Sequence, residues 1–346
     1  MKKEITTLKV AGTYIGTIVG AGFASGQEML QFFTVFGIKG YYGLLVVTLL
    51  FIFFGYIVME LGQKLKAPSH LPIIRFTGGR YLGTFADAVI TFFLFGGLTA
   101  MIAGSGALFS QEFHIHPLAG NAIMAVITLI TVLSGFSGMI NAISLVVPFL
   151  ILSAAGVSIA SFFVQPKPIP LEVMPPHSGF LRNWLWSAVI YTSYNTVTAI
   201  AILGPLGAQV QDKKTLRNGA ILGGLGLGIG AFAILAAMEF NLSQIYTMDI
   251  PMIAIARRIS PTVRILYAIV LLAEIYTTAV GSLYGFCARL AEGRNKERIF
   301  ITFTAIGLAF GASLFGFSNL VKYLYPAVGY LGVIILGSLV FNRYKA

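Results

Sequence analysis

The amino-acid sequence predicts an all-α integral membrane protein, and three observations support this: its composition, its apolar segments and the placement of its charges. Hydrophobic residues make up 57% of the 346 residues and charged residues only 10%, and the mean hydropathy is +0.86. Soluble domains carry about 25% charged residues, so this composition is typical of a protein within a bilayer. The apolar segments predict ten helices that cross the membrane, at about 20 residues per crossing. They leave no separate soluble domain, so residues 1–346 are expected to form a single transmembrane domain.

The expected spans follow one another along the chain with short connections. Lys2 and Lys3 precede the first span, which is too long for a signal peptide and lacks a small-residue cleavage site, so we expect it to stay uncleaved. A short surface helix is expected to begin at Pro251, because proline suits the first turn of a helix. The spans cover residues 8–36, 40–62, 81–111, 118–134, 138–164, 182–208, 215–240, 262–291, 298–314 and 318–342.

Lys and Arg residues set the expected orientation, because they are enriched in cytoplasmic loops. With the N-terminus in the cytoplasm, most of the 23 Lys and Arg residues fall in cytoplasmic segments. The external stretch 241–261, with Arg257 and Arg258, is the exception. We therefore expect a multi-pass protein of the cell membrane with both termini in the cytoplasm. The net charge of +11 belongs to its loops and does not indicate a nucleic-acid partner.

The two halves of the chain repeat one another weakly. An offset of 179 residues (59 to 238) lays Met59-Glu60 on Met238-Glu239 and Pro72 on Pro251, and spans of matching length follow in the same order. The predicted repeats, 1–165 and 180–346, hold five spans each. Because five is an odd number, the repeats must have opposite orientations in the membrane. Such 5+5 inverted repeats with discontinuous helices are typical of secondary transporters, which bind solute at the interface of the repeats.

A glycine-rich stretch interrupts the first span. Gly20, Gly22 and Gly26 are followed directly by Gln27 and Glu28. Glycine weakens a helix interior, and an unpaired backbone group in hydrocarbon costs several kcal/mol, so we expect a break that faces a cavity. Its freed amides would bind an anion and its freed carbonyls a cation. Close helix packing through small residues is the alternative, but it explains neither Gln27 nor Glu28.

Two further features extend this prediction. Glu28 lies in the outer half of the span and is a candidate gate residue, with an interfacial helix cap as the alternative. The repeat offset places the polar run 191–196 of the sixth span opposite the first break. We expect an unwound segment there. The alternative is a kinked but continuous helix, because Ser and Thr can bond their own helix backbone.

Glu274 lies near the middle of the eighth span. A carboxylate there costs at least ~2.5 kcal/mol, so it should face the protein interior and is a functional candidate. Thr277 and Thr278 lie on the same helical face. Glu274 could carry a proton or help to hold a small hard cation, and the alternative is a protonated side chain that bonds a neighbouring helix. The repeat offset places Phe95 opposite Glu274.

These features resemble a known superfamily. Gly20-Ala21-Gly22 in a broken first span, the 5+5 inverted repeat and the Thr pair of the eighth span are similar to the amino acid–polyamine–organocation superfamily, which has the LeuT-type fold. The longer stretch from Gly20 to Glu28 resembles more narrowly the bacterial YkvI-like membrane proteins. The likeness covers essentially the whole chain.

The resemblance implies that the first and sixth spans, both broken, rock against a scaffold of the third, fourth, eighth and ninth. It also implies that main-chain groups of these two spans hold a small zwitterionic solute, typically an amino acid. The expected substrate-binding residues are Gly20, Ala21, Gly22, Phe23, Ala24, Ser25, Tyr191, Tyr194, Asn195 and Phe95.

The superfamily's commonest sodium site would use the carbonyls of Gly16 and Val19 with hydroxyls of the eighth span. Thr277 and Thr278 fit this pattern, but Glu274 stands where the superfamily has a small residue, which leaves sodium and proton coupling open. Proton-coupled relatives often carry a Lys in the fifth span, and residues 138–164 contain none.

We therefore expect a secondary active transporter of a small organic solute, coupled to Na⁺ or H⁺, whose partners are the solute and the lipid bilayer. A ligand-sensing receptor, like the membrane subunits of spore germinant receptors, is the first alternative, and a channel is the second. An enzyme is not expected, and apart from that sodium no cofactor is expected. The single Cys287 allows neither an intramolecular disulfide nor a cysteine-based metal cluster, and the histidines fall between the spans: His70, His114, His116 and His177.

Overall fold

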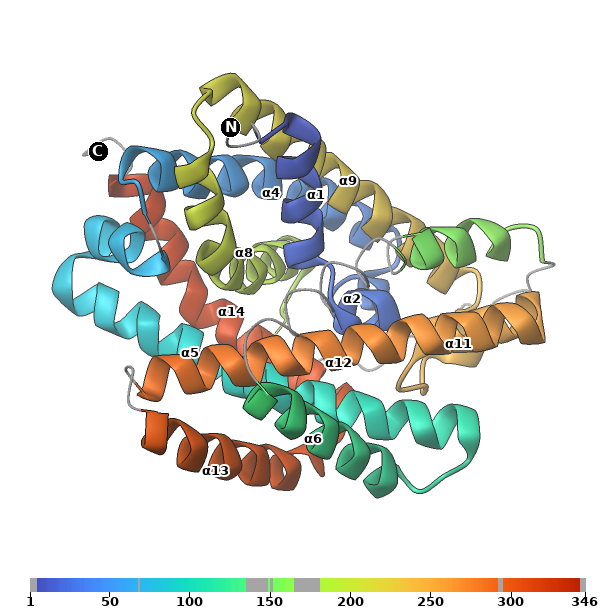
Figure 1. Ribbon diagram of the computed structural model, residues 1–346. Coiled ribbons are helices and arrows are strands. Elements are labelled where there is room, and N and C mark those ends of the chain that lie inside the picture. Colours follow the sequence, from blue (N-terminus) through green and yellow to red (C-terminus); the bar gives the residue numbers. More distant parts are fainter. Residues whose placement is uncertain are drawn as a thin grey trace.

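The computed structural model describes residues 5–67, 69–134, 149, 152–164, 181–291 and 295–342, and helices form nearly all of them (Figure 1). The helices follow the expected spans closely, because long apolar stretches satisfy their backbone groups only as helices within a membrane. They are α1 (Thr7–Ile18), α2 (Ala21–Ser25), α3 (Gln27–Phe32), η1 (Thr34–Phe36), α4 (Ile38–Lys64), α5 (His70–Phe113), α6 (Pro117–Ser134), α8 (Trp184–Gln209), α9 (Lys213–Glu239), α10 (Leu242–Ile245), α11 (Pro251–Ile259), α12 (Pro261–Ala291), α13 (Asn295–Ser313) and α14 (Phe317–Asn342).

Seven of the described helices are long and apolar enough to cross a membrane: α4, α5, α6, α8, α9, α12 and α14. The first expected span is divided into short helices, and α13 coincides with the ninth. About half of the fifth expected span, 138–164, lies outside the described residues, which include a short apolar helix at Leu152–Ser161. The count of ten spans and the inverted repeat of 1–165 and 180–346 therefore stay predictions.

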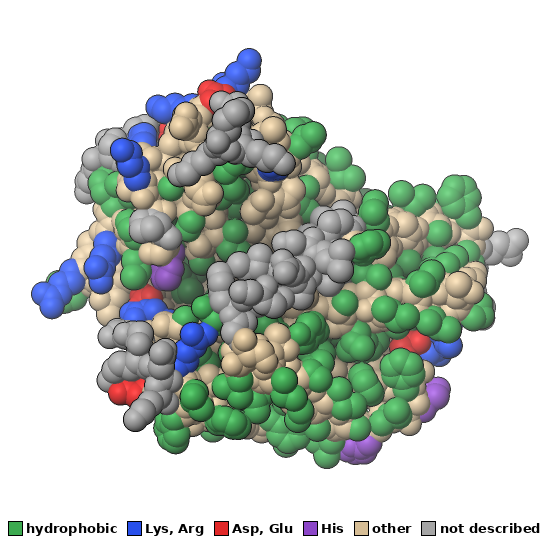
Figure 2. Space-filling model, viewed as in Figure 1, with side chains coloured by type: hydrophobic (Ala, Val, Ile, Leu, Met, Phe, Trp, Pro, Cys, Tyr) green, Lys and Arg blue, Asp and Glu red, His purple; other side chains and the backbone are tan. Residues whose placement is uncertain are grey.

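The chain connections define two ends of the molecule. At one end, the Gln63 side chain donates to the carbonyl of Val210 at 2.7 Å, and the Asn342 side chain donates to that of Thr77 at 2.6 Å. The start of α1 and the end of α14 lie toward this end in Figure 1. We call it the inner end. The opposite end, which we call the outer end, carries the stretch 241–261. Figure 2 shows a largely apolar surface on one face, with most of its Lys and Arg side chains toward the inner end.

The helices pack in two groups. One group contains α1, α4, α8 and α9, and the other contains α5, α6, α12 and α13, while α14 packs against both α5 and α8 (Figure 1). Within the first group, α4 and α8 are in backbone contact. A Cβ atom on Gly62 would lie 2.1 Å from the carbonyl oxygen of Gly204, and one on Gly207 would lie 2.0 Å from that of Met59. This contact makes α4 and α8 a single packed unit.

The predicted break in the first span is confirmed. Helix α1 ends at Ile18, and Val19 and Gly20 have extended backbone conformations before α2 begins. A second break follows at Gly26, whose φ of 84° lies in the left-handed region that favours glycine. The glycine-rich stretch therefore forms a short helix with an interruption on each side.

The predicted unwinding of the sixth span is wrong. Helix α8 runs without a break from Trp184 to Gln209 and includes the whole polar run 191–196. Its polar side chains bond carbonyls one turn back: Thr192 Oγ1 donates to Ala188 at 2.9 Å, and Asn195 Nδ2 donates to Tyr191 at 3.0 Å. These bonds satisfy the polar groups without opening the helix, which is the alternative of a continuous helix.

Helix α5 changes direction at Gly79, which has φ 64° and ψ −164°. The segment 70–78 therefore folds back along the following part of the helix. This places the ring of His70 beside Asp87, with His70 Nε2 3.3 Å from Asp87 Oδ1. The kink thus brings a residue from between two expected spans to the wall of the site described next.

Candidate functional site: a cavity at the break of the first span

A cavity of about 520 Å³ lies where the break between α1 and α2 faces α5, α8 and α12. Buried side chains surround it beside the break, namely Glu28, Met101, Tyr194, Glu274 and Tyr325. The cavity extends from there toward the inner end, where its lining includes His70, Asp87 and Arg289.

The cavity opens toward the inner end. Glu28 is only 5% exposed and Glu274 only 4%. By contrast, the Arg289 side chain at the inner end of the cavity is 36% exposed. A solute would therefore reach the break from the inner end.

Hydrogen bonds close the outer end over α2 and α3. Gln27 Nε2 donates to the carbonyl of Met248 and to Ser318 Oγ, both at 2.8 Å, and Ser318 Oγ donates in turn to Asp249 Oδ1. The hydroxyl of Tyr267 donates to the carbonyl of Ala24. The stretch 241–261 is thus attached to the outer half of the first span.

Side chains at the end of α5 hold the same stretch in place. Gln111 exchanges two hydrogen bonds with the backbone of Ile250, at 2.9 and 3.1 Å. The buried Glu112 carboxylate pairs with Arg257 at 3.0 Å and with Arg264 at 3.3 Å. Arg257, which broke the charge pattern of the sequence, therefore attaches α11 to α5. The cavity is therefore closed at the outer end and open at the inner end.

Glu28 lies inside the cavity lining. Its side chain folds back onto the break, so that a Cβ atom on Gly22 would lie 2.3 Å from Glu28 Oε1. The Tyr191 hydroxyl donates to Glu28 Oε2 at 3.0 Å. The rings of Tyr191, Tyr194 and Tyr325 follow one another around this carboxylate, with centroids 5.5 and 5.2 Å apart. The expected gate residue is thus placed at the centre of the site.

The predicted coupling residues also line this cavity: Gly16, Val19, Glu274, Thr277 and Thr278. Thr278 Oγ1 donates to Glu274 Oε1 at 3.2 Å, whereas Thr277 Oγ1 donates to the carbonyl of Glu274 at 3.1 Å. Glu274 Oε2 is buried and has no hydrogen-bond partner among the described residues. An unpaired carboxylate oxygen beside hydroxyl and carbonyl oxygens is a donor set that fits Na⁺, and it equally fits a proton on Glu274.

The predicted substrate-binding residues separate into two sets. Gly20, Ala21, Gly22, Tyr194 and Asn195 line the cavity.

The remaining ones take other positions. Tyr191 donates a hydrogen bond to Glu28 and does not itself line the cavity. Ser25 Oγ donates to the carbonyl of Gly22 at 3.0 Å, and the carbonyl of Ala24 accepts the hydrogen bond from Tyr267. Phe23 points toward Gly230 of α9. Phe95 does not line this cavity but lines an adjoining groove with Phe286, at 5.6 Å between ring centroids, because the repeat offset matches residue numbers and not helix faces.

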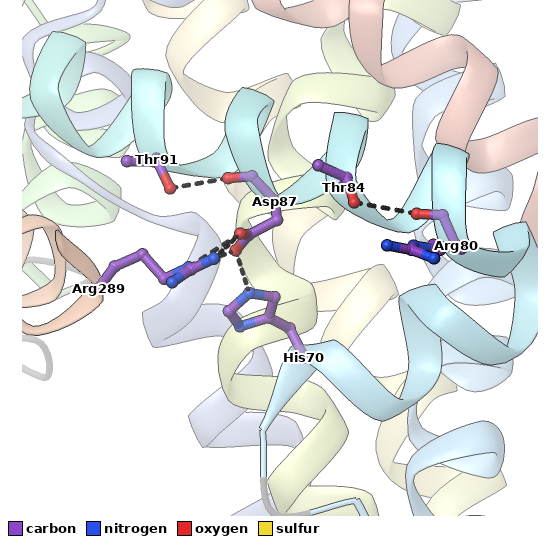
Figure 3. Close-up of polar contacts among 6 residues, drawn as sticks. All are labelled: His70, Arg80, Thr84, Asp87, Thr91 and Arg289. Atoms are coloured by element: carbon purple, nitrogen blue, oxygen red, sulfur yellow. Dashed lines mark hydrogen bonds and ion pairs between the residues drawn. The ribbon is translucent and has the colours of Figure 1, made fainter. Parts of the chain in front are cut away.

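Three residues at the inner end of the cavity were missed from the sequence (Figure 3). Arg289 Nε lies 2.8 Å from both carboxylate oxygens of Asp87, and Nη2 contacts Oδ2. His70 approaches the same carboxylate from the other side of the kink in α5. The available signal was Asp87 itself, an acidic residue within the third apolar span, since ionisable residues at membrane depth mark functional positions.

Comparison with known sequences gives two relatives. No family model matches the chain. The chain is 29% identical over 335 residues to the uncharacterized membrane protein YkvI of Bacillus subtilis, covering 97% of this chain and 95% of YkvI. It is also 29% identical over 328 residues to the uncharacterized protein YyaD of the same organism, covering 93% of this chain and 92% of YyaD.

Solved structures share the fold at low sequence identity. MhsT in complex with L-phenylalanine aligns with a TM-score of 0.63 and 15% identity, over 99% of this chain and 93% of MhsT. A mutant of the Eremococcus coleocola manganese transporter aligns with a TM-score of 0.60 and 12% identity, over 96% of this chain and 78% of the transporter. The inward-facing conformation of Mhp1 aligns with a TM-score of 0.56 and 14% identity, over 94% of this chain and 75% of Mhp1. The expected resemblance is thereby confirmed: the chain is a membrane protein with the LeuT-type fold, similar to YkvI and YyaD over nearly its whole length.

Proposed function

We propose that this protein is a secondary active transporter that moves a small organic solute across the cell membrane by alternating access. One observation carries the proposal: a cavity reaches the break in the first span, opens at the inner end and is closed at the outer end. In transporters built this way, solute binds at the discontinuous helix and the packed groups of helices move around it. Opening the outer end would complete the cycle.

The cavity supports an organic solute of modest size. Its volume of about 520 Å³ and its apolar lining, including Ile90, Leu94 and Met101, suit a carbon skeleton better than a bare metal ion. The LeuT-type resemblance implies an amino acid or a related zwitterion. The MhsT structure, which contains L-phenylalanine, makes that amino acid a practical first probe.

Coupling is proposed at Glu274, with Thr278 beside it. A carboxylate buried at membrane depth must be neutralised by a bound cation or by a proton. The carbonyls of Gly16 and Val19 and the hydroxyl of Thr277 would complete the ligands of a sodium ion. The same Glu274 would carry the proton if the protein is proton-coupled.

The inner end is proposed to face the cytoplasm, with both termini there, because most Lys and Arg residues fall on that side. A receptor of the same fold would bind solute without moving it, a channel would need both ends open at once, and an enzyme would chemically change the solute. The inward-facing cavity with a closed outer end supports transport.

Counterflow in proteoliposomes tests the proposal. Proteoliposomes loaded with unlabelled amino acids and amines, L-phenylalanine first, should accumulate the matching labelled solute. Gly20→Leu should abolish this exchange, because no atom lies within 4 Å of a Cβ at position 20 and the larger side chain would extend into the cavity. The matched control is Gly12→Leu, at an exposed position of α1 that also has free space. Solute binding without counterflow would instead indicate a receptor.

A further inference from the structure

We propose that the transported solute is an amine whose ammonium group binds to the Glu28 carboxylate in exchange for a proton. The proposal rests on the proposed transport function and specifies the solute class at the same site. The LeuT-type resemblance implies a zwitterionic solute at the break, whereas this proposal places the ammonium group of the solute there.

The first step concerns the charge of Glu28. The titratable side chains that face it are Tyr191 and Tyr194 from α8 and Tyr325 from α14, with Glu274 across the cavity. Helix α2 carries no titratable side chain, and Glu239 of α9 interacts with Tyr41. Within the described part of the chain, no salt bridge joins Glu28 to Lys or Arg. A carboxylate buried this way is stable only with a proton or with a cation from outside the protein.

The second step concerns the break itself. In the expected arrangement, main-chain groups at Gly20–Ala24 receive the solute carboxylate. Here Glu28 Oε1 already occupies the space against Gly22. A solute carboxylate would find this space filled and could not replace the proton on Glu28, and Glu274 adds a second acidic group to the same cavity. Arg289 lines the inner end of the cavity and is paired with Asp87. The central part of the cavity therefore favours a positive group.

The third step concerns the aromatic rings. Phe93 lies 5.9 Å from Tyr194 and 5.7 Å from Tyr325, between ring centroids, and all three residues line the cavity beside Glu28. Aromatic faces attract ammonium groups, most strongly where water is excluded. The buried Tyr194 hydroxyl lies beside the Glu28 carboxylate, and its oxygen can accept a hydrogen bond from an N–H donor. Carboxylate, rings and hydroxyl together form an ammonium site.

The exchange balances in protons and charge. With the site empty of solute, Glu28 carries one proton and is neutral. When R–NH₃⁺ enters, the carboxyl O–H bond breaks, the proton leaves to water in the cavity, and the ammonium charge replaces it. One proton is released for each amine bound, and the cavity keeps the same net charge in both states. Proton and amine therefore compete for Glu28 and would cross the membrane in opposite directions.

Binding to the purified full-length protein tests this proposal with three related probes. 2-Phenylethylamine has the ammonium group alone, L-phenylalanine has both charged groups, and 3-phenylpropionate has the carboxylate alone. Calorimetry in two buffers with different ionisation enthalpies counts the protons released. We expect 2-phenylethylamine to bind at least about tenfold more tightly than L-phenylalanine, since removing or opposing a buried charge partner costs this much or more. We also expect about one proton released per amine and an affinity that falls about tenfold per unit decrease in pH.

Variants of Glu28 separate binding from folding. Glu28→Gln should lose both amine binding and proton release, whereas Glu28→Asp, which keeps the carboxylate, should retain proton release with weaker binding. Glu239→Gln is the matched control, because Glu239, the last residue of α9, is another partly buried acid that does not line the cavity, and this variant should bind as the wild type does. Elution profile and thermal unfolding show whether each variant is folded.

Several results would overturn the inference. These are equal or tighter binding of L-phenylalanine, amine binding without proton release, unchanged amine binding in folded Glu28→Gln, or binding of none of the three probes. The proposed function is judged separately. If the Glu28→Gln variant still shows counterflow of L-phenylalanine, the proposed transport function is supported and the proposed ammonium site is contradicted.

Discussion

Gly22 and Glu28 approach so closely that a Cβ atom at position 22 would lie 2.3 Å from Glu28 Oε1. The glycine at this position therefore accommodates a side chain of the protein itself. In a LeuT-type site this contact places a carboxylate of the protein beside the broken helix, where a solute is expected. The conformation of one glutamate thus determines what the break can bind.

Gly22→Ala should displace the Glu28 carboxylate from the break. We expect solute binding to weaken at least about tenfold, because the ligand loses a correctly placed charge partner. Gly12→Ala, in open space on α1, controls for adding a methyl group to a helix. The double variant Gly22→Ala, Glu28→Asp should lose less than the sum of the two single changes, since the shorter acid leaves room for the methyl group. Strict additivity would show that the two positions act independently.

Glu274→Gln should uncouple transport from its ion gradient. If Na⁺ is the coupling ion, this variant loses sodium-stimulated binding, and Thr278→Ala weakens it by about tenfold or more, as for other lost ligand contacts. If H⁺ is the coupling ion, Glu274→Gln abolishes accumulation driven by a pH gradient and retains exchange, while Thr278→Ala has the smaller effect. Uptake and binding are measured against both gradients. Wild-type coupling in Glu274→Gln would leave Glu274 a structural residue.

Asp87→Asn should destabilise the inner end of the cavity, because it leaves the Arg289 charge without its carboxylate. Since the Arg289 side chain is 36% exposed, we expect about 1–2 kcal/mol, below the value for a fully buried pair. Thermal unfolding measures the loss. The double variant Asp87→Arg, Arg289→Asp, which exchanges the two charges, should recover part of the lost stability. No recovery would mean that His70 and the local geometry matter more than the ion pair.

Gln27→Ala should favour opening of the outer end. It removes the two hydrogen bonds that Gln27 donates across the outer end, to Met248 and Ser318, which together contribute about 1–3 kcal/mol to closure. A single cysteine at the buried cavity position Met101, in a Cys287→Ser background, would then react at least about fivefold faster with an impermeant thiol reagent added outside. Gln63→Ala is the control, because it removes two hydrogen bonds at the inner end. An equal rate in both variants would argue against an outer closure built on Gln27.

Both termini and the loop before α9 should be cytoplasmic. Cysteines at Lys214 and Met248, each in the Cys287→Ser background, lie at the inner and outer ends of the molecule. An impermeant thiol reagent should label Met248→Cys from outside intact cells and Lys214→Cys only from the cytoplasmic side. The reverse pattern would invert the proposed orientation.

The sequence predicted the helices well and the site in part. Hydropathy alone located α4, α8 and α14 to within a few residues, because each must bury its backbone in lipid. It also predicted the break near Gly20, where glycine and polar residues meet within an apolar span.

The sequence failed where a local choice depends on tertiary contacts. Whether Thr192 and Asn195 unwind a helix or bond its previous turn cannot be read from their order in the chain. The position of Glu28 depends on Tyr191, which is 163 residues away. The role of Asp87 likewise depends on Arg289, a partner 202 residues distant, and on the kink at Gly79.

The backbone contact between α4 and α8 affects how mutational surveys of this protein should be interpreted. Positions 62 and 207 have no room for any side chain, because each faces a carbonyl oxygen of the other helix. A scan of all substitutions would score these positions as intolerant as any that touch the solute. Intolerance alone would therefore point to the α4–α8 contact as strongly as to the cavity, and only a scan scored separately for protein abundance and for transport would tell the two regions apart.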